Sequence, residues 1–260
     1  MLPLVFIPGI QGRWEYNRGT VDALSAYFQV LTFSLRGRTM EDYVSQVSRT
    51  LDEHQVERAV ICGVSFGGLV ALRFAAAFPE RTTALVMVST PAPGWHLRPR
   101  HQLYARLPWI FGPLFLAETP WRLRAEMAAA LPDWRARWAF RRAALRTFIS
   151  APVPLSAMAA RARLIERLDM RADCARVAAP TLVVTGEAHL DHVVPAEGST
   201  EYVKLIKGAR AAILERTGLT GTMTRPDAFA EMVHRFIVGA DASYGPGRTH
   251  GSAPTPSRVA

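Results

Sequence analysis

The sequence has little cysteine, little lysine and no long apolar run. Only two of its 260 residues are cysteines, Cys62 and Cys174. Two cysteines are too few for a disulfide framework or a cysteine-based metal centre. Cys62 also lies in the apolar stretch AVICGV, which is typical of a small buried side chain. We therefore expect a protein of a reducing compartment, the cytoplasm, with no metal and no other cofactor.

A membrane span and a secretion signal are also lacking. The best apolar candidate, residues 107–117, is shorter than the roughly 20 residues of a spanning helix and is interrupted by Pro and Gly. The start, MLPLVFIPG, has neither a basic region nor a cleavage site, so no secretory signal is expected. The chain is long enough to bury a large core. These features predict a globular protein without a transmembrane segment.

Acidic residues are scarce relative to basic ones, and the formal net charge is +9. Most of this excess lies in residues 92–171, which are rich in arginine and contain no lysine. A general preference for arginine is the simplest interpretation, and an anionic acyl substrate or a membrane surface is the functional alternative. No nucleic-acid-binding motif accompanies the charge, so we expect no nucleic-acid partner.

Apolar strands alternate with helical segments over residues 1–91 and again over residues 172–240. This alternation predicts βαβ units and a parallel sheet that is covered on both faces. Residues 92–171 are helical and punctuated by proline, which predicts an insertion into one α/β core. Residues 241–260 are rich in Gly, Pro and Ser and predict a disordered tail.

The inserted segment also contains five of the six tryptophans. We expect its large aromatic side chains to form the apolar interior of the insertion rather than a ligand site: Trp109, Phe111, Phe115, Trp121, Trp134 and Trp138.

A G-x-S-x-G motif, Gly63-Val64-Ser65-Phe66-Gly67, falls between a predicted strand and a predicted helix. In that position the motif is typical of a nucleophile elbow. A sharp turn holds the serine in a strained conformation, and the small flanking residues let the backbones approach. The motif therefore predicts Ser65 as a nucleophile, with a plain turn and an N-capping serine as the alternative.

On these residues the chain resembles the α/β-hydrolase superfamily, from residue 2 to residue 238. The loop PGIQG after the first strand is similar to the oxyanion loop of that superfamily. The resemblance implies that the backbone N–H groups of Ile10 and Phe66 bind an oxyanion and that Gln11 could assist. A plain Gly-rich turn is the alternative for this loop.

The resemblance also implies an α/β-hydrolase fold with a helical cap, residues 92–171, that shapes the substrate pocket. Superfamily members usually have one or two strands ahead of the oxyanion strand, whereas this sequence begins on it. We therefore expect a reduced, mostly parallel sheet of about six strands.

The acid of a catalytic triad is the next position that the resemblance assigns. Asp191 in LDHVVP follows the penultimate strand as the superfamily's acid does, and Glu187 is the reserve candidate. A carboxylate there would orient the catalytic base and stabilise its charged form. The alternative for Asp191 is an ordinary loop or capping carboxylate.

The base is missing. Between the last strand and the last helix the superfamily places Gly-His, and this chain has Gly218-Leu219. The hydroxyls of the neighbouring threonines cannot accept the proton of a serine at neutral pH. In an unrelated serine hydrolase, loss of the histidine costs on the order of 10⁶ in turnover. As substitute bases we rank His96 first and His192 second.

Two classes of function follow. The first is a serine hydrolase acting on a small, largely apolar ester or related acyl compound, with its base displaced or absent. The second is a non-catalytic homologue that binds a small ligand in the pocket between cap and core. A third interpretation is that Leu219 replaces the base of an otherwise intact enzyme.

Overall fold

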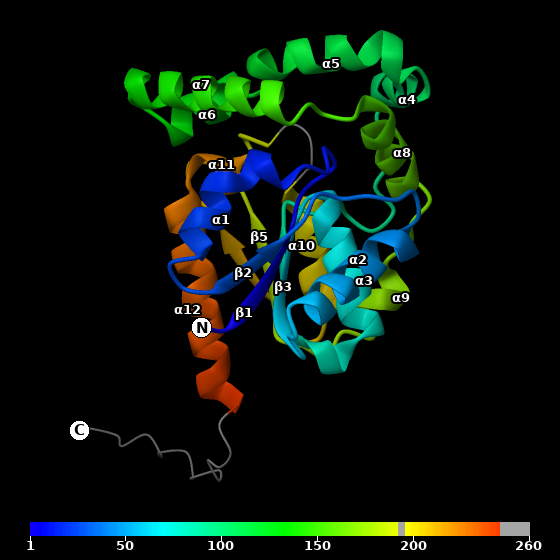
Figure 1. The fold of residues 1–260 in the computed structure, drawn as a ribbon, viewed down its shortest axis with the longest axis vertical. Coiled ribbons are helices and arrows are strands. Elements are labelled where there is room, and N and C mark those ends of the chain that lie inside the picture. Colours follow the sequence, from blue (N-terminus) through cyan, green and yellow to red (C-terminus); the bar gives the residue numbers. More distant parts are fainter. Residues whose placement is uncertain (192–195, 245–260) are drawn as a thin grey trace, which may run out of the picture.

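A six-stranded parallel sheet forms the centre of the molecule, in the order β2-β1-β3-β4-β5-β6. The computed structural model describes residues 1–191 and 196–244 (Figure 1). The strands are β1 (Pro3–Ile7), β2 (Gln29–Thr32), β3 (Ala59–Val64), β4 (Thr82–Val88), β5 (Thr181–Thr185) and β6 (Arg210–Ile213). The predicted strand number is confirmed, and the sheet is wholly parallel.

The central strands owe their position to their apolar, β-branched sequences. Every residue of β3, AVICGV, is buried, and so is every residue of β5, TLVVT. Continuous apolar strands of this kind need cover on both faces of the sheet. The outermost strands, β2 and β6, are only four residues long and partly exposed, which limits the unpaired edges.

Helices cover the two faces of the sheet. Apolar residues of α2, α3, α9 and α10 pack on one face, and those of α1 and α12 pack on the other. These and the shorter elements of the core are η1 (Trp14–Asn17), α1 (Arg18–Leu24), α2 (Met40–Glu53), α3 (Phe66–Ala77), η2 (Pro79–Arg81), α9 (Arg171–Cys174), α10 (Ala196–Leu205), α11 (Gly221–Thr224) and α12 (Pro226–Tyr244).

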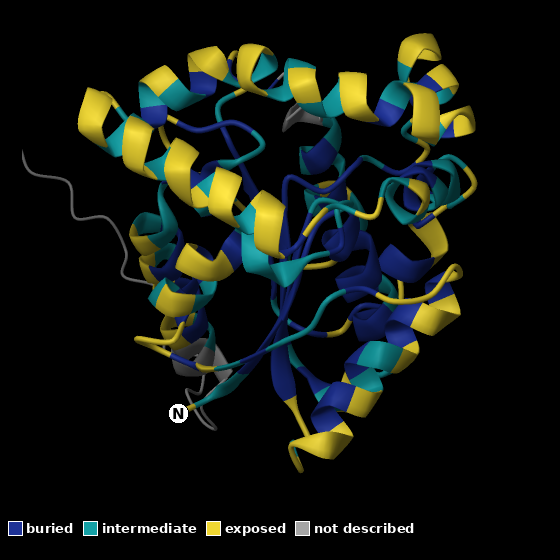
Figure 2. Ribbon diagram, turned by 45° about the horizontal axis from the view of Figure 1, so that its top comes forward, coloured by how far each residue is buried: buried dark blue, intermediate teal, exposed yellow. Residues whose placement is uncertain are grey.

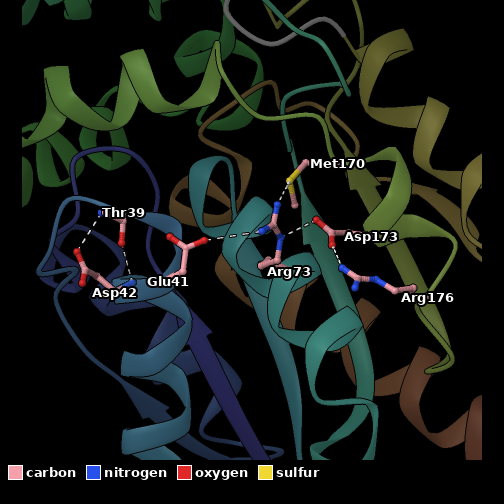
Figure 3. A network of polar contacts seen from close by, with 7 residues as sticks. All are labelled: Thr39, Glu41, Asp42, Arg73, Met170, Asp173 and Arg176. Atoms are coloured by element: carbon pink, nitrogen blue, oxygen red, sulfur yellow. Dashed lines mark hydrogen bonds and ion pairs between the residues drawn. The ribbon is translucent and has the colours of Figure 1, made fainter.

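Polar contacts fix the start of α2 and the junction between α3 and α9 (Figure 3). Thr39 and Asp42 form a reciprocal capping box, in which the Asp42 N–H donates to the Thr39 hydroxyl and the Thr39 N–H donates to the Asp42 carboxylate. Arg73 of α3 donates from Nε to the buried Asp173 carboxylate at 2.6 Å, and Arg176 pairs with the same carboxylate. This ion pair attaches the chain leaving the insertion to the core.

The insertion forms a helical layer over the carboxyl ends of the strands (Figure 1). Its helices are α4 (Pro99–Arg106), α5 (Pro108–Arg122), α6 (Arg124–Ala130), α7 (Trp134–Ser150) and α8 (Leu155–Ile165). Within the described residues no single helix is long and apolar enough to cross a bilayer. Helices α7 and α8 taken together have the length and composition of a membrane span, but they are bent by 103° relative to each other.

Two expectations need correction. The four tryptophans of α5 and α7 are not the interior of the cap: their exposed fractions are 76% for Trp109, 70% for Trp121, 59% for Trp134 and 56% for Trp138. Three phenylalanines of the same helices, Phe111, Phe115 and Phe140, are half-buried. In addition, α12 continues to Tyr244, past the start expected for the tail at residue 241, and residues 245–260 lie outside the described part of the chain.

Candidate active site

Ser65 occupies a strained turn between β3 and α3. Its backbone angles are φ 53° and ψ −118°, in a region that non-glycine residues rarely adopt. Its N–H donates to the Val88 carbonyl of the neighbouring strand at 2.7 Å, which ties the turn to the sheet. The Ser65 side chain does not cap α3. The turn therefore has the geometry of a nucleophile elbow and not that of an N-capping serine.

The glycines around Ser65 permit this turn. A Cβ atom on Gly63 would overlap the Gly67 carbonyl, and one on Gly67 would overlap the Ile7 carbonyl of β1. A Cβ on Gly68 would overlap the Thr90 hydroxyl. Helix α3 therefore approaches strand β1 at backbone contact and the segment after β4 at the Thr90 side chain, and this approach presents Ser65 at the carboxyl edge of the sheet.

The loop after β1 lies against the elbow. A Cβ atom on Gly9 would be 3.6 Å from the Cβ of Ser65. The Gly12 N–H donates to the Gly9 carbonyl at 2.9 Å and closes a turn that contains Ile10 and Gln11. Phe66 begins α3, so its N–H has no acceptor within the helix. The two backbone segments expected to bind an oxyanion thus both adjoin Ser65.

A buried arginine of the cap holds this loop, and no sequence pattern distinguishes it from the many other arginines. Arg161 of α8 is 1% exposed and donates from Nη1 to the Ile10 carbonyl at 2.9 Å and from Nη2 to the Leu35 carbonyl at 2.8 Å. A Cβ on Gly12 would overlap the Arg161 guanidinium. Gly12 has a φ of +74° and therefore serves both the turn and the approach of the arginine.

Asp191 is buried, with 8% of its surface exposed, and its N–H donates to the Glu187 carbonyl at 3.2 Å. The reserve candidate Glu187 faces elsewhere: its carboxylate accepts the Arg216 N–H at 2.7 Å and lies 3.5 Å from the exposed His189. Asp191 is therefore the better enclosed of the two carboxylates.

The loop of Leu219 packs against the loop of Asp191. A Cβ on Gly218 would be 3.1 Å from the Asp191 backbone nitrogen, and the Glu187 N–H donates to the Thr217 carbonyl at 2.7 Å. Leu219 itself is half-buried. The residue expected at the base position thus follows a glycine that touches the Asp191 loop, and its side chain has no titratable group.

A second carboxylate, from the cap, stands at this loop. Glu126 of α6 is 1% exposed, and its Oε1 accepts the N–H groups of Gly218 and Thr220, each at 2.8 Å, on either side of Leu219. Its Oε2 is buried and has no hydrogen-bond partner within the described residues. The only signal in the sequence was a lone acid in the Ala-rich stretch RAEMAAA.

Burial raises the pKa of Glu126, and the nearby Asp191 carboxylate raises it further, against the lowering effect of the hydrogen bonds from the 218–220 loop. Two carboxylates therefore share one enclosed region and raise each other's proton affinity. This electrostatic arrangement favours the proton-bound form of Glu126.

The candidate substitute histidines are less enclosed. His96 is exposed and lies between α4 and the end of β4. His192 lies outside the described residues. No group of three or more potential metal ligands occurs in residues 1–191 and 196–244. Two surface hollows lie away from Ser65. One, of about 320 Å³, is lined by residues that include Thr82 and Pro180. The other, of about 470 Å³, is lined by residues that include Trp109 and Ser156.

Comparison with known proteins agrees with this architecture. The sequence model of the alpha/beta hydrolase family matches residues 4–232. A protein of Azorhizobium caulinodans named "Putative carbamate hydrolase RutD" is 26% identical over 92% of this chain and 92% of its own. The 3-oxoadipate enol-lactonase 1 of Acinetobacter baylyi is 24% identical over 87% of this chain and 84% of its own. A solved thermophilic esterase from Thermogutta terrifontis superposes with a TM-score of 0.73 at 22% identity, over 92% of this chain and 90% of that one, and shows the same fold. The chain belongs to the α/β-hydrolase family.

Proposed function

We propose that this protein hydrolyses a small, largely apolar ester or related acyl compound, with Ser65 as the nucleophile. The observation that carries the proposal is the strained turn at Ser65, which an ordinary capping serine would not need. The hydroxyl oxygen attacks the acyl carbon, and the N–H groups of Ile10 and Phe66 bind the negative oxygen that forms. The alcohol then leaves, and water hydrolyses the acyl-serine.

The attack requires an acceptor for the Ser65 proton, and Leu219 cannot be one. We assign this role first to Glu126, because its unpartnered Oε2 is enclosed at the loop where the family carries its base. Burial also raises the pKa of Glu126, which makes it a stronger base than an ordinary carboxylate. The negative charge of Asp191 would stabilise the protonated form of Glu126 that results from the proton transfer. His96 and His192 remain the other candidates.

The relatives support the class of substrate. They are named for a carbamate, an enol-lactone and, at 25% identity in Nitrosomonas europaea, the methyl ester of a pimeloyl group. All three contain an acyl carbon bonded to a heteroatom that leaves. Two free, buried cysteines fit a reducing compartment, and we place the protein in the cytoplasm.

Binding of a small ligand without turnover is the second candidate, and the observation that favours it is Leu219 itself. A pocket without a base still binds and polarises an acyl group, but such a site retains only about 10³–10⁴ of rate over water. The two candidates are therefore separated by turnover and not by affinity.

Hydrolysis of p-nitrophenyl butyrate and labelling by a fluorophosphonate test the proposal. We expect slow turnover and labelling that are both lost in Ser65→Ala. If Glu126 is the base, Glu126→Gln abolishes turnover, and kcat/KM of the unmodified chain rises with pH through the raised pKa of Glu126. Glu187→Gln, a carboxylate on the adjacent loop, is the matched control and should retain activity.

Loss of turnover in His96→Ala, with Glu126→Gln unaffected, would reject Glu126 as the base. Turnover that survives Ser65→Ala would reject the nucleophile. A chain that binds the ester but neither turns it over nor is labelled, with or without Leu219→His, would favour the binding function.

A further inference from the structure

The outward face of the cap carries its apolar side chains toward solvent. Every residue of α7 is exposed or half-buried. At 100° per residue, its exposed large apolar side chains fall within an arc of about 100°, while the half-buried Phe140 lies on the other side. This stripe consists of Trp134, Trp138, Leu145, Phe148 and Ile149, whose exposed fractions range from 43% to 73%.

Helix α5 continues this apolar face. Ile110, Leu114 and Trp121 recur at helical spacing and are 66%, 45% and 70% exposed. Pro113 and Ala117 lie between them and are also exposed. Both helices belong to the layer at the end of the molecule opposite the C-terminal end of α12, and Figure 2 shows exposed residues along their length. Exposed apolar side chains that recur along one face of a helix differ from the single, scattered ones of an ordinary monomer surface.

Positive charge accompanies the stripe of α7. The helix contains five arginines and no acidic residue. Arg141 and Arg142 flank the stripe at the middle of the helix and are exposed, as are Arg135 and Arg146. Within the described part of the chain no carboxylate lies within ion-pair distance of any of the five. Their charge is therefore free to meet an external anion.

We propose that the outer face of α5 and α7 docks onto the surface of an anionic lipid bilayer. A helix that lies in the plane of a bilayer combines aromatic and aliphatic side chains on one face with arginines beside them, and α7 has this combination. Tryptophan favours the boundary between headgroups and acyl chains. The charge complementarity selects anionic lipid over a second copy of the chain, since two copies would bring ten uncompensated arginines together.

Sedimentation of the full chain with lipid vesicles tests the proposal. We expect binding to vesicles that contain phosphatidylglycerol, weaker binding to vesicles of phosphatidylcholine alone, and a decrease as salt is raised. Each arginine near an anionic surface contributes about 1 kcal/mol, so Arg141→Gln with Arg142→Gln should weaken partitioning roughly thirtyfold. Trp138→Ser with Ile149→Ser should weaken it at least as much.

The matched control is Arg235→Gln with Val238→Ser, which removes one arginine and one exposed aliphatic side chain from α12, far from the cap. This variant should bind vesicles as the unmodified chain does. Three outcomes would overturn the proposal: no binding to anionic vesicles, equal loss in the control and the α7 variants, or self-association through α7 in the absence of vesicle binding. Circular dichroism verifies that each variant is folded.

Discussion

Truncation of Glu126 should destabilise the fold through the loop of Leu219. In Glu126→Ala, the N–H groups of Gly218 and Thr220 lose their acceptor, and both lie in a region that excludes water. Each such donor left unpaired costs about 1–3 kcal/mol. Relief of a buried charge beside Asp191 offsets part of this cost. We therefore expect a net loss of about 3 kcal/mol, a large share of the roughly 5–15 kcal/mol that stabilises a typical protein.

Urea denaturation followed by circular dichroism measures this loss, and thermal unfolding should show a decrease in Tm of roughly 6–12 °C. Glu187→Ala is the control: this carboxylate accepts the N–H of Arg216 at a solvent-exposed turn, so its removal should cost less than about 1 kcal/mol. An unchanged midpoint in Glu126→Ala, or an equal effect in the control, would refute the assignment of Glu126 to this loop.

The conservative variant Glu126→Gln adds a pH dependence. The glutamine oxygen can accept the same two N–H groups, so its effect on stability at acid pH should be small. Burial raises the pKa of Glu126 above its ordinary value of about 4.3. The contribution of the protonated carboxyl is complete below that value and is lost as pH rises through the raised pKa of the folded state. The stability of the unmodified chain relative to Glu126→Gln should therefore fall with rising pH, and a difference that rises would contradict the burial of this group.

Three further substitutions have defined outcomes. Leu219→His would place an imidazole between two carboxylates, and we expect kcat/KM for p-nitrophenyl butyrate to rise by at least about 10³; no rise would argue against the interpretation that Leu219 replaces the base of an otherwise intact enzyme. Gly63→Ala brings a methyl group onto the Gly67 carbonyl, and we expect the free energy of unfolding, measured by urea denaturation, to fall by roughly 3 kcal/mol. An unchanged free energy of unfolding would refute the close approach of the backbones at the elbow. Arg161→Met leaves the carbonyls of Ile10 and Leu35 without their donor. We expect a loss of stability of about 2–5 kcal/mol and weaker labelling of Ser65 by a fluorophosphonate. Retained labelling would show that the oxyanion loop does not depend on the arginine.

The fold could be predicted from the sequence because its signals are local and periodic. Strand β3 is continuously apolar and runs directly into the Gly-x-Ser-x-Gly turn, so its burial and its neighbour α3 follow from one short stretch. The alternation of apolar strands and helical segments also predicts the helical insertion and the number of strands. The strained backbone of Ser65 followed from the steric demands of that turn.

The cap could not be predicted in the same detail. Glu126 and Arg161 act over 92 and 151 residues of sequence separation, on N–H and carbonyl groups that no sequence pattern distinguishes. The prediction of an interior position for Trp134 and Trp138 is wrong, because a helical pattern does not say which face of the helix the rest of the protein covers. The half-buried residues of α7 are Ala136, Arg137, Phe140, Ala144 and Thr147, whereas both tryptophans are exposed.

The costs built into the site favour a catalytic origin over simple binding. The turn at Ser65 stores strain of about 1–3 kcal/mol, and the enclosure of Asp191 beside Glu126 adds the cost of two neighbouring buried carboxylates. A pocket that only held a neutral apolar ligand would gain nothing from either feature. A hydrolase needs both, because the strain presents the hydroxyl and the negative region stabilises a protonated base. These two costs therefore support the proposed hydrolysis over binding alone.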